Sequence, residues 1–292
     1  MSKAPVRIDQ WLAEASARLA HDKSQSDPES PAVDAEVLLL HRLGKPRSFL
    51  FTWPEHLLDE AMQAQLAADL DRRFSGEPVA HITGERDFWT LTLESNPSTL
   101  IPRPETESLV EAALGLPLAD EARVVDLGTG TGAIALALAS ERPHWQLEAV
   151  EYSAEAAALA RRNAARLALP VTVHQGSWYA PLAGRRFDLI ISNPPYIDPV
   201  DHHLEQGDVR FEPKSALIAA NRGLADIEQI ALEAPQHLTP GGVLMVEHGY
   251  DQGAAVRDLF TAAGLTEVKT GQDLGRRDRF TQGVWPGENS SK

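Results

Sequence analysis

Two different spacings of hydrophobic residues divide the chain. In the N-terminal part, apolar residues recur every three or four positions, which is the spacing of one helical face. The first such face is made of Ile8, Trp11, Leu12, Ala15 and Leu19. The same spacing predicts helices over residues 32–43 and 59–74, with Gly44 as a cap for the former. We therefore expect a helical domain at residues 1–76.

From residue 123 onward, short apolar runs alternate with longer stretches of helical spacing. The apolar runs predict strands at 124–127, 146–151, 171–174, 187–192 and 242–247. The stretches between and after them predict helices at 133–142, 154–169, 224–238 and 252–263, with Pro235 kinking or ending the third early. Two further strands near 267–270 and 280–285 are expected to pair as a hairpin. This alternation predicts an α/β fold with a mostly parallel sheet that is covered on both faces, at residues 105–288.

The segment between these two parts, residues 77–104, has the character of a linker. Short β-prone pieces flank Gly84-Glu85 and predict a hairpin there. Residues 96–107 (NPSTLIPRPETE) contain three prolines, each of which fixes its own φ. We therefore expect a stiff connector that leads into a helix at 105–114.

Composition and charge narrow the possible functions. The 292-residue chain has a net charge of −15 and no cysteine, which excludes disulfides, thiolate metal sites and cysteine nucleophiles. No histidine spacing is typical of a metal site, and no apolar run reaches the ~18 residues that a membrane span needs. The acidic charge argues against a large nucleic-acid interface. We expect a cytoplasmic monomer that binds no metal, no membrane and no nucleic acid directly.

A glycine-rich loop, Asp126-Leu-Gly-Thr-Gly-Thr-Gly132, lies between the first predicted strand of the sheet and the next helix. Glycines there allow tight turns and close approach of a ligand to the backbone. Glu151 ends the next strand, where a carboxylate can accept both hydroxyl protons of a ribose. This pattern fits S-adenosylmethionine (AdoMet) and a nicotinamide dinucleotide equally well.

A second motif, Ser192-Asn-Pro-Pro-Tyr196, follows the strand at 187–192. In a doubly wound sheet, that strand end opens into the same crevice as the glycine loop. The prolines fix the backbone, so the Asn193 side-chain oxygen and the Pro194 carbonyl can both accept hydrogen bonds from one NH2 group. Tyr196 offers a flat face for a planar group. Such a site orients a poorly nucleophilic amide or aromatic amine towards an electrophilic methyl group, which favours AdoMet over a nicotinamide cofactor.

Several motifs together resemble those of the HemK/PrmC family, the AdoMet-dependent protein-(glutamine-N5) methyltransferases that modify class I peptide chain release factors. The resemblance covers nearly the whole chain. Besides the glycine loop and Ser192–Ile197, it is carried by residues 76–84 (GEPVAHITG), 100–107 (LIPRPETE) and 209–213 (VRFEP). The Asn-Pro-Pro-Tyr motif alone is shared with amino-directed DNA and RNA methyltransferases, whereas the combination is much more specific.

The resemblance implies a class I (Rossmann-like) methyltransferase domain, joined by the hairpin to a helical domain that recognises the substrate. The implied substrate is the glutamine of a release factor Gly-Gly-Gln motif.

AdoMet would be bound by Gly128, Thr129, Gly130, Thr131, Gly132, Glu151, Trp178 and Asn193. The glutamine would be bound by Asn193, Pro194, Pro195 and Tyr196, with Asn193, Pro194 and Tyr196 counted as catalytic. Trp178 is assigned to the adenine, and Arg103 and Glu105 to the shape of the AdoMet pocket. The family more often has Asp at the position of Glu151, and the polar loop at residues 22–31 is longer than expected.

Three other functions remain open. An amino-methyltransferase acting on DNA adenine or RNA guanine would share the Asn-Pro-Pro-Tyr motif, but it would need a basic groove. A nicotinamide-dependent oxidoreductase would share the glycine loop, but it leaves residues 193–196 unexplained. A non-catalytic adaptor would need neither motif.

Overall fold

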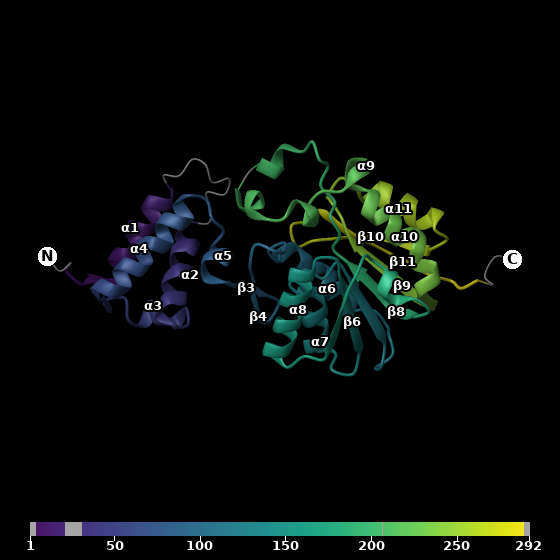
Figure 1. Cartoon of the computed structure of the whole chain (residues 1–292), viewed down its shortest axis with the longest axis horizontal. Helices are drawn as coiled ribbons and strands as arrows, with labels where there is room; N and C mark the ends of the chain where they lie inside the picture. The colour runs from purple at the N-terminus through teal and green to yellow at the C-terminus, as the bar shows by residue number, and fades with distance from the viewer. Residues whose placement is uncertain (1–3, 21–30, 206, 289–292) are drawn as a thin grey trace. The chain divides into compact units, whose positions relative to one another are not determined.

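The structure is a computed structural model that describes residues 4–20, 31–205 and 207–288. The chain divides into two compact units (Figure 1). Unit 1 falls within residues 1–85 and 202–211, and unit 2 within residues 86–201 and 212–292. The polar loop expected at residues 22–31 lies outside the described residues, except for Pro31.

Unit 1 is helical, as the apolar spacing predicts. Its helices are α1 (Ile8–Ala20), α2 (Pro31–Leu43), α3 (Ser48–Thr52), α4 (Glu60–Phe74) and α5 (Val79–Thr83). Its other elements are the paired strands β1 (Val6–Arg7) and β2 (Leu57–Leu58), and the 3-10 turns η3 (His202–Glu205) and η4 (Gly207–Phe211). The Asp59 side chain accepts a hydrogen bond from the Met62 N–H and so caps α4. The helices α3 and α5 were not predicted, because five residues are too few to show a helical period.

The interior of unit 1 combines an apolar cluster with one buried cation. Ile8, Leu38 and Leu66 are fully buried in the cluster. The Arg73 guanidinium contacts the Asp34 carboxylate at 2.7 Å and the Asp208 carboxylate at 2.8 Å. A buried arginine needs such partners to offset its loss of hydration. The pair with Asp34 joins α4 to α2, and the pair with Asp208 connects η4 to α4, although η4 follows α4 by more than a hundred residues.

The linking hairpin consists of β3 (Glu85–Phe88) and β4 (Leu91–Glu94). Its turn lies at Trp89-Thr90. The hairpin predicted around Gly84-Glu85 therefore exists, but its turn lies about five residues further along the chain. Gly84 instead ends α5 in the left-handed conformation, at φ 75°. Trp89 has a φ of 58°, and the Glu107 carboxylate accepts a hydrogen bond from its backbone N–H at 2.8 Å. A long-range contact of this kind leaves no local sequence signal.

Unit 2 alternates strands and helices. Its strands after the hairpin are β5 (Arg123–Leu127), β6 (Gln146–Glu151), β7 (Val171–Gln175), β8 (Phe187–Ser192), β9 (Leu238–Glu247), β10 (Thr266–Gln272) and β11 (Asp278–Val284). Its α-helices are α6 (Glu107–Leu114), α7 (Ala133–Glu141), α8 (Ala154–Leu167), α9 (Ala220–Gly223), α10 (Ala225–His237) and α11 (Gly253–Ala262). Short 3-10 turns are η1 (Pro104–Thr106), η2 (Ala180–Leu182) and η5 (Lys214–Ala216).

Among the described residues, these strands form a seven-stranded sheet in the order β10-β11-β9-β8-β5-β6-β7. The five strands from β9 to β7 in this order run parallel, whereas β11 is antiparallel to both β9 and β10. The predicted C-terminal hairpin is thus confirmed, as is the α/β fold class. Because β5 lies between β8 and β6, the carboxyl ends of these three strands are neighbours. A crevice at such strand ends is where open α/β sheets bind their ligands.

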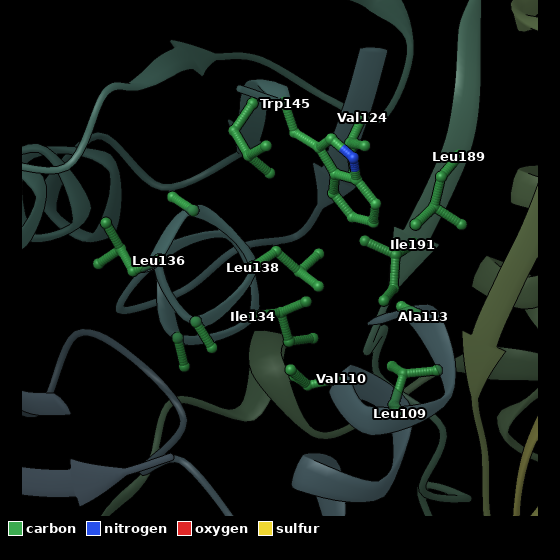
Figure 2. Close-up of a cluster of buried hydrophobic side chains, with 14 of the residues drawn as sticks. Leu109, Val110, Ala113, Val124, Ile134, Leu136, Leu138, Trp145, Leu189 and Ile191 are labelled. Atoms are coloured by element: carbon green, nitrogen blue, oxygen red, sulfur yellow. The ribbon is translucent and has the colours of Figure 1, made fainter. Parts of the chain in front are cut away.

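Successive side chains along the strands enter two different apolar clusters. Val124, Leu189 and Ile191 pack with α6 and α7 on one face of the sheet, as Figure 2 shows. Val125 and Ile190 pack with α10 and α11 on the other face. This alternation follows the two-residue period of a strand. Burial on both faces explains why these strands are continuous apolar runs in the sequence.

Two details of unit 2 differ from expectation. The helix α10 continues to His237 and is not ended early by Pro235. A proline in the last turn removes only one backbone hydrogen bond, and buried residues such as Ile230 and Ala234 keep the helix packed on the sheet. The expected helix at 105–114 begins with the separate turn η1. No helix in the described part of the chain is both long and apolar enough to cross a membrane.

Candidate active site

A cavity of about 290 Å³ opens in unit 2. Of the residues that sequence reasoning assigns to the site, those that line it are Arg103, Gly128, Thr129, Gly130, Thr131, Glu151, Trp178, Asn193 and Pro195. They come from the ends of β5, β6 and β8, from the segment after β7, and from the connector before α6. The structure therefore brings the glycine loop and Asn193 to one cavity, as the two motifs predict.

The glycine loop between β5 and α7 turns on residues of positive φ. Gly128 has a φ of 73°, and a Cβ atom there would lie 3.3 Å from the Trp178 ring. Only glycine fits this position without strain or crowding. The backbone N–H groups of Gly128 and Thr129 both donate to the Val150 carbonyl, which ties the loop to β6.

The Glu151 carboxylate at the end of β6 is held by two backbone N–H groups. Gly130 donates to Oε2 at 2.9 Å, and Ser153 donates to Oε1 at 2.9 Å. A carboxylate has about four acceptor positions, so both oxygens retain capacity for a ligand hydroxyl. A neighbouring acid, Asp126, is fully buried, and burial raises its pKa to about 7. The Thr129 hydroxyl donates to the Asp126 carboxylate at 2.5 Å and opposes this rise.

Asn193 is placed beside the glycine loop by the register of the sheet. Ser192 pairs with Leu127 across the parallel strands, and the Ser192 hydroxyl donates to the Leu127 carbonyl at 2.7 Å. The Asn193 Nδ2 group donates to the Thr106 hydroxyl at 3.2 Å. Asn193 Oδ1 is therefore the side-chain atom left to accept a hydrogen bond from a ligand.

Four predicted site residues, Gly132, Pro194, Tyr196 and Glu105, fall outside the described set that lines the cavity. Pro194 is buried at the strand exit. The Tyr196 ring packs against the apolar cluster of α10 and α11, and its hydroxyl donates to Glu247 at 3.2 Å. Burial and the Glu247 charge both raise the pKa of Tyr196. Gly132 sits at the start of α7.

Two motifs that are far apart in the sequence meet at the cavity rim. Arg103 Nη2 contacts both carboxylate oxygens of Glu212, at 2.8 and 2.7 Å. The Ile101 N–H donates to the same carboxylate at 3.2 Å. The buried Glu212 thereby fixes the proline-rich connector, and this explains how Arg103 shapes the cavity without being part of a strand.

Sequence reasoning missed other lining residues, among them Phe88, Thr99, Leu100, Thr106, Tyr152 and Asp226. Tyr152 directly follows Glu151, and the residue is 74% exposed. Its position next to an acidic strand end was a usable signal for a ring beside a bound ligand. Asp226, by contrast, is not near any motif in the sequence.

Comparisons with known proteins agree with this arrangement. Residues 10–84 match the family model "PrmC N-terminal domain", and residues 106–209 match "Methyltransferase small domain". Among solved structures, a methyltransferase from Pyrococcus furiosus is similar in fold, with a TM-score of 0.53 and 19% identity, over 77% of this chain and 98% of that chain.

Curated relatives share much more of the sequence. The release factor glutamine methyltransferase of Vibrio cholerae is 54% identical over 91% of this chain and 94% of its own length. That of Escherichia coli K12 is 50% identical over 95% of this chain and 99% of its own length. The chain therefore belongs to the family of release factor glutamine methyltransferases.

Proposed function

We propose that this protein transfers a methyl group from AdoMet to the side-chain amide nitrogen (N5) of the glutamine in the Gly-Gly-Gln motif of class I release factors. The observation that carries the proposal is the single cavity that joins the glycine loop, Glu151 and Asn193. The names of the curated relatives support both the reaction and the substrate class.

The residues on the cofactor side of the cavity fit AdoMet. Gly128 and Gly130 carry no side chain, so their backbone is open to a ligand. Glu151 can accept from ribose hydroxyls, while the rings of Trp178 and Tyr152 provide flat surfaces for the adenine. Bound AdoMet supplies an electrophilic methyl group on a positively charged sulfur.

The opposite side of the cavity can bind the glutamine amide. Asn193 Oδ1 and the Pro194 carbonyl accept the two N–H bonds of the side-chain amide and turn its nitrogen towards the methyl group. Pro195 lines this side of the cavity, whereas Tyr196, whose ring packs outside the described lining, is assigned to the glutamine pocket by its motif alone. The nitrogen forms the new N–C bond as the S–C bond breaks, and it loses a proton only after it has become positive. Positioning of this kind can contribute ~7–11 kcal/mol at most.

Recognition of the release factor is assigned to the helical domain at residues 1–76, joined by residues 77–104 to the catalytic domain at 105–288. The net charge of −15 favours a protein partner over nucleic acid. We also propose that the protein acts as a monomer in the cytoplasm.

The proposal is tested by incubating the protein with methyl-labelled AdoMet and three acceptors. These are a class I release factor, the same factor with its motif glutamine changed to alanine, and duplex DNA. We expect label on the unmodified factor alone. Label on DNA would support an amino-directed DNA methyltransferase instead, and equal label on both factors would refute the glutamine assignment.

A further inference from the structure

The turn between β10 and β11, residues 273–277, displays side chains that do not pack on the rest of the fold. Leu274 is 95% exposed, and Arg276 and Arg277 are exposed as well. Neither arginine side chain makes an ion pair or a hydrogen bond with a described residue. The whole chain has a net charge of −15, so two unpaired cations beside an exposed leucine are a local exception to its acidic character.

The backbone of this turn is held firmly from within. Asp273 is only 8% exposed, and its Oδ1 accepts a hydrogen bond from the Arg277 N–H at 3.0 Å. Its Oδ2 accepts from Arg279 Nη2 at 3.1 Å. The Arg276 N–H donates to the Asp273 carbonyl at 2.9 Å. Side chains on a fixed backbone lose less conformational entropy on binding than those on a flexible loop.

The residues displayed by the turn do not stabilise the fold. Arg276 has a φ of 59°, a left-handed conformation that is unfavourable for a residue with a Cβ atom and that glycine adopts readily. Leu274 buries almost no apolar surface. Residues that work against local stability are expected at functional surfaces, because a different requirement has selected them.

The register of the sheet places this turn on the glutamine side of the cavity. Phe280 in β11 pairs with Glu247 at the end of β9, and Ser192 at the end of β8 pairs with Val246. The turn before β11 and the exit of β8 therefore lie at the same edge of the sheet. Two strand spacings separate β11 from β8, which is about 10 Å. Tyr250, which is 65% exposed, belongs to the loop that follows β9 at this edge.

The chemistry of these side chains favours a protein partner. Arginine and tyrosine are enriched among the residues that contribute most to protein–protein binding. The guanidinium of arginine can bind a carboxylate through two parallel hydrogen bonds. A nucleic acid would need a larger basic area than two arginines provide. A protein that places a glutamine at Asn193 must bring the surface around that glutamine to this edge of the sheet.

We propose that Leu274, Arg276, Arg277 and Tyr250 form a docking surface for an acidic face of the protein that carries the target glutamine. Carboxylates of the partner pair with the two arginines, and an apolar side chain contacts Leu274 and Tyr250. The inference rests on the proposed glutamine methylation, which requires a protein acceptor. The surface contributes to binding of the acceptor and takes no part in methyl transfer.

The test uses Arg276→Gly and Arg277→Glu in the full-length protein. We measure kcat and KM for a release factor at low and high salt, together with the melting temperature. Both variants should raise KM about 10-fold while kcat stays near wild type. The rise for Arg277→Glu should shrink at high salt, where charge interactions are screened. The melting temperature of Arg276→Gly should not fall, because glycine adopts a φ of 59° without strain.

A matched control is Glu267→Gly in the same hairpin. Glu267 is exposed and has a φ of 51°, so this variant also replaces a left-handed residue with glycine. It follows Thr266, which pairs with Val284 at the opposite end of β11 from the turn. Its KM for the release factor should equal that of the wild type. The control separates the loss of a contact from a change in the backbone of the hairpin.

The outcomes distinguish the two proposals. If both arginine variants keep the wild-type KM, the docking surface is wrong while the methylation stands. If Glu267→Gly raises KM as much as Arg276→Gly does, hairpin conformation is the cause and the docking surface is again wrong. The same holds if the arginine variants keep their KM but lose affinity for an RNA oligonucleotide. If the wild-type protein does not methylate the release factor at all, both proposals fail.

Discussion

The glycine loop and the Asn-Pro-Pro-Tyr exit lie at the ends of two neighbouring parallel strands, yet they are built in opposite ways. The loop after β5 lacks side chains at Gly128, Gly130 and Gly132, and it offers a bare backbone. The exit from β8 is stiffened by two prolines and depends on the side chain of Asn193. The first construction suits a ligand that must come close to the main chain. The second suits a ligand that must be turned to a particular angle.

Because the glycine loop and the β8 exit are built differently, we expect mutations in them to change different measured quantities. Changes in the glycine loop should act on the binding of AdoMet, whereas changes at the β8 exit should act on the rate of transfer. The following predictions test this separation, in order of decreasing effect.

Replacement of Asn193 by alanine should have the largest effect. The variant loses the acceptor that orients the glutamine amide, so kcat should fall about 100- to 1000-fold. AdoMet affinity, measured by calorimetry, should stay near the wild-type value, because Glu151 and the glycine loop are intact. A variant with normal turnover, or with AdoMet affinity lost in parallel, would remove the distinction between the two strand ends.

Gly128→Val should weaken AdoMet binding by about 10- to 100-fold. Its new side chain would start 3.3 Å from the Trp178 ring and would narrow the cavity, besides straining a φ of 73°. Gly184→Val is a matched control, because Gly184 has the same φ but nothing within 4 Å of its Cβ position. Both variants should lose comparable stability. If Gly184→Val weakened AdoMet binding equally, backbone strain and not cavity shape would be the cause.

Glu151→Gln should raise the AdoMet dissociation constant about 10-fold, in line with the ~1.5 kcal/mol of a charge-assisted hydrogen bond. The new amide NH2 would face the N–H of Gly130 or Ser153, both of which now donate to the carboxylate. With saturating AdoMet, kcat should be nearly unchanged. A fall in kcat at saturation would show that the loop side also controls the reaction rate.

Glu247→Gln should have the smallest effect. The difference in melting temperature between this variant and the wild type should change by a few degrees with pH. Burial raises the pKa of Glu247 from 4.5 to about 7 in the folded protein, while contacts with Thr106, Arg279 and Tyr196 oppose the rise and the Glu105 charge adds to it. The folded state thus binds this proton more tightly than the unfolded state, and wild-type stability falls as pH rises from about 4.5 to about 7.

The glutamine variant lacks this titration. Its melting temperature relative to wild type should therefore be higher at pH 8 than at pH 5, when both proteins are scanned in the same buffers. Asp126, whose pKa is also raised to about 7, is present in both proteins and cancels in the difference. A difference that stays constant across this pH range would contradict the raised pKa.

The sequence predicts correctly those strands and loops that are determined by neighbouring residues in the chain. The strands of the sheet are apolar runs bounded by turn residues, and both functional loops directly follow such a run. For this reason Glu151 and Asn193 could be assigned to one crevice before any coordinates were known. The family assignment rests on the same local motifs, and the curated relatives confirm it.

The features that escaped prediction depend on contacts between distant segments. The turn of the hairpin at Trp89 is held by Glu107. The side-chain partners of Asn193 and Tyr196 are Thr106 and Glu247, which lie 87 and 51 residues away in the sequence. No periodicity or spacing links such residues, because their proximity arises only when the sheet is assembled. The assignment of Pro194 and Tyr196 to the glutamine pocket stays a prediction.

The most direct test of the central claim is to identify the atom that receives the methyl group. A release factor labelled with ¹⁵N in its glutamine side chains is incubated with the protein and ¹³C-methyl AdoMet, and the product is studied by NMR. We predict a methyl signal that shows one-bond ¹³C–¹⁵N coupling, from a single glutamine amide nitrogen. A transferred methyl group without that coupling would place the methyl on another atom and contradict the account.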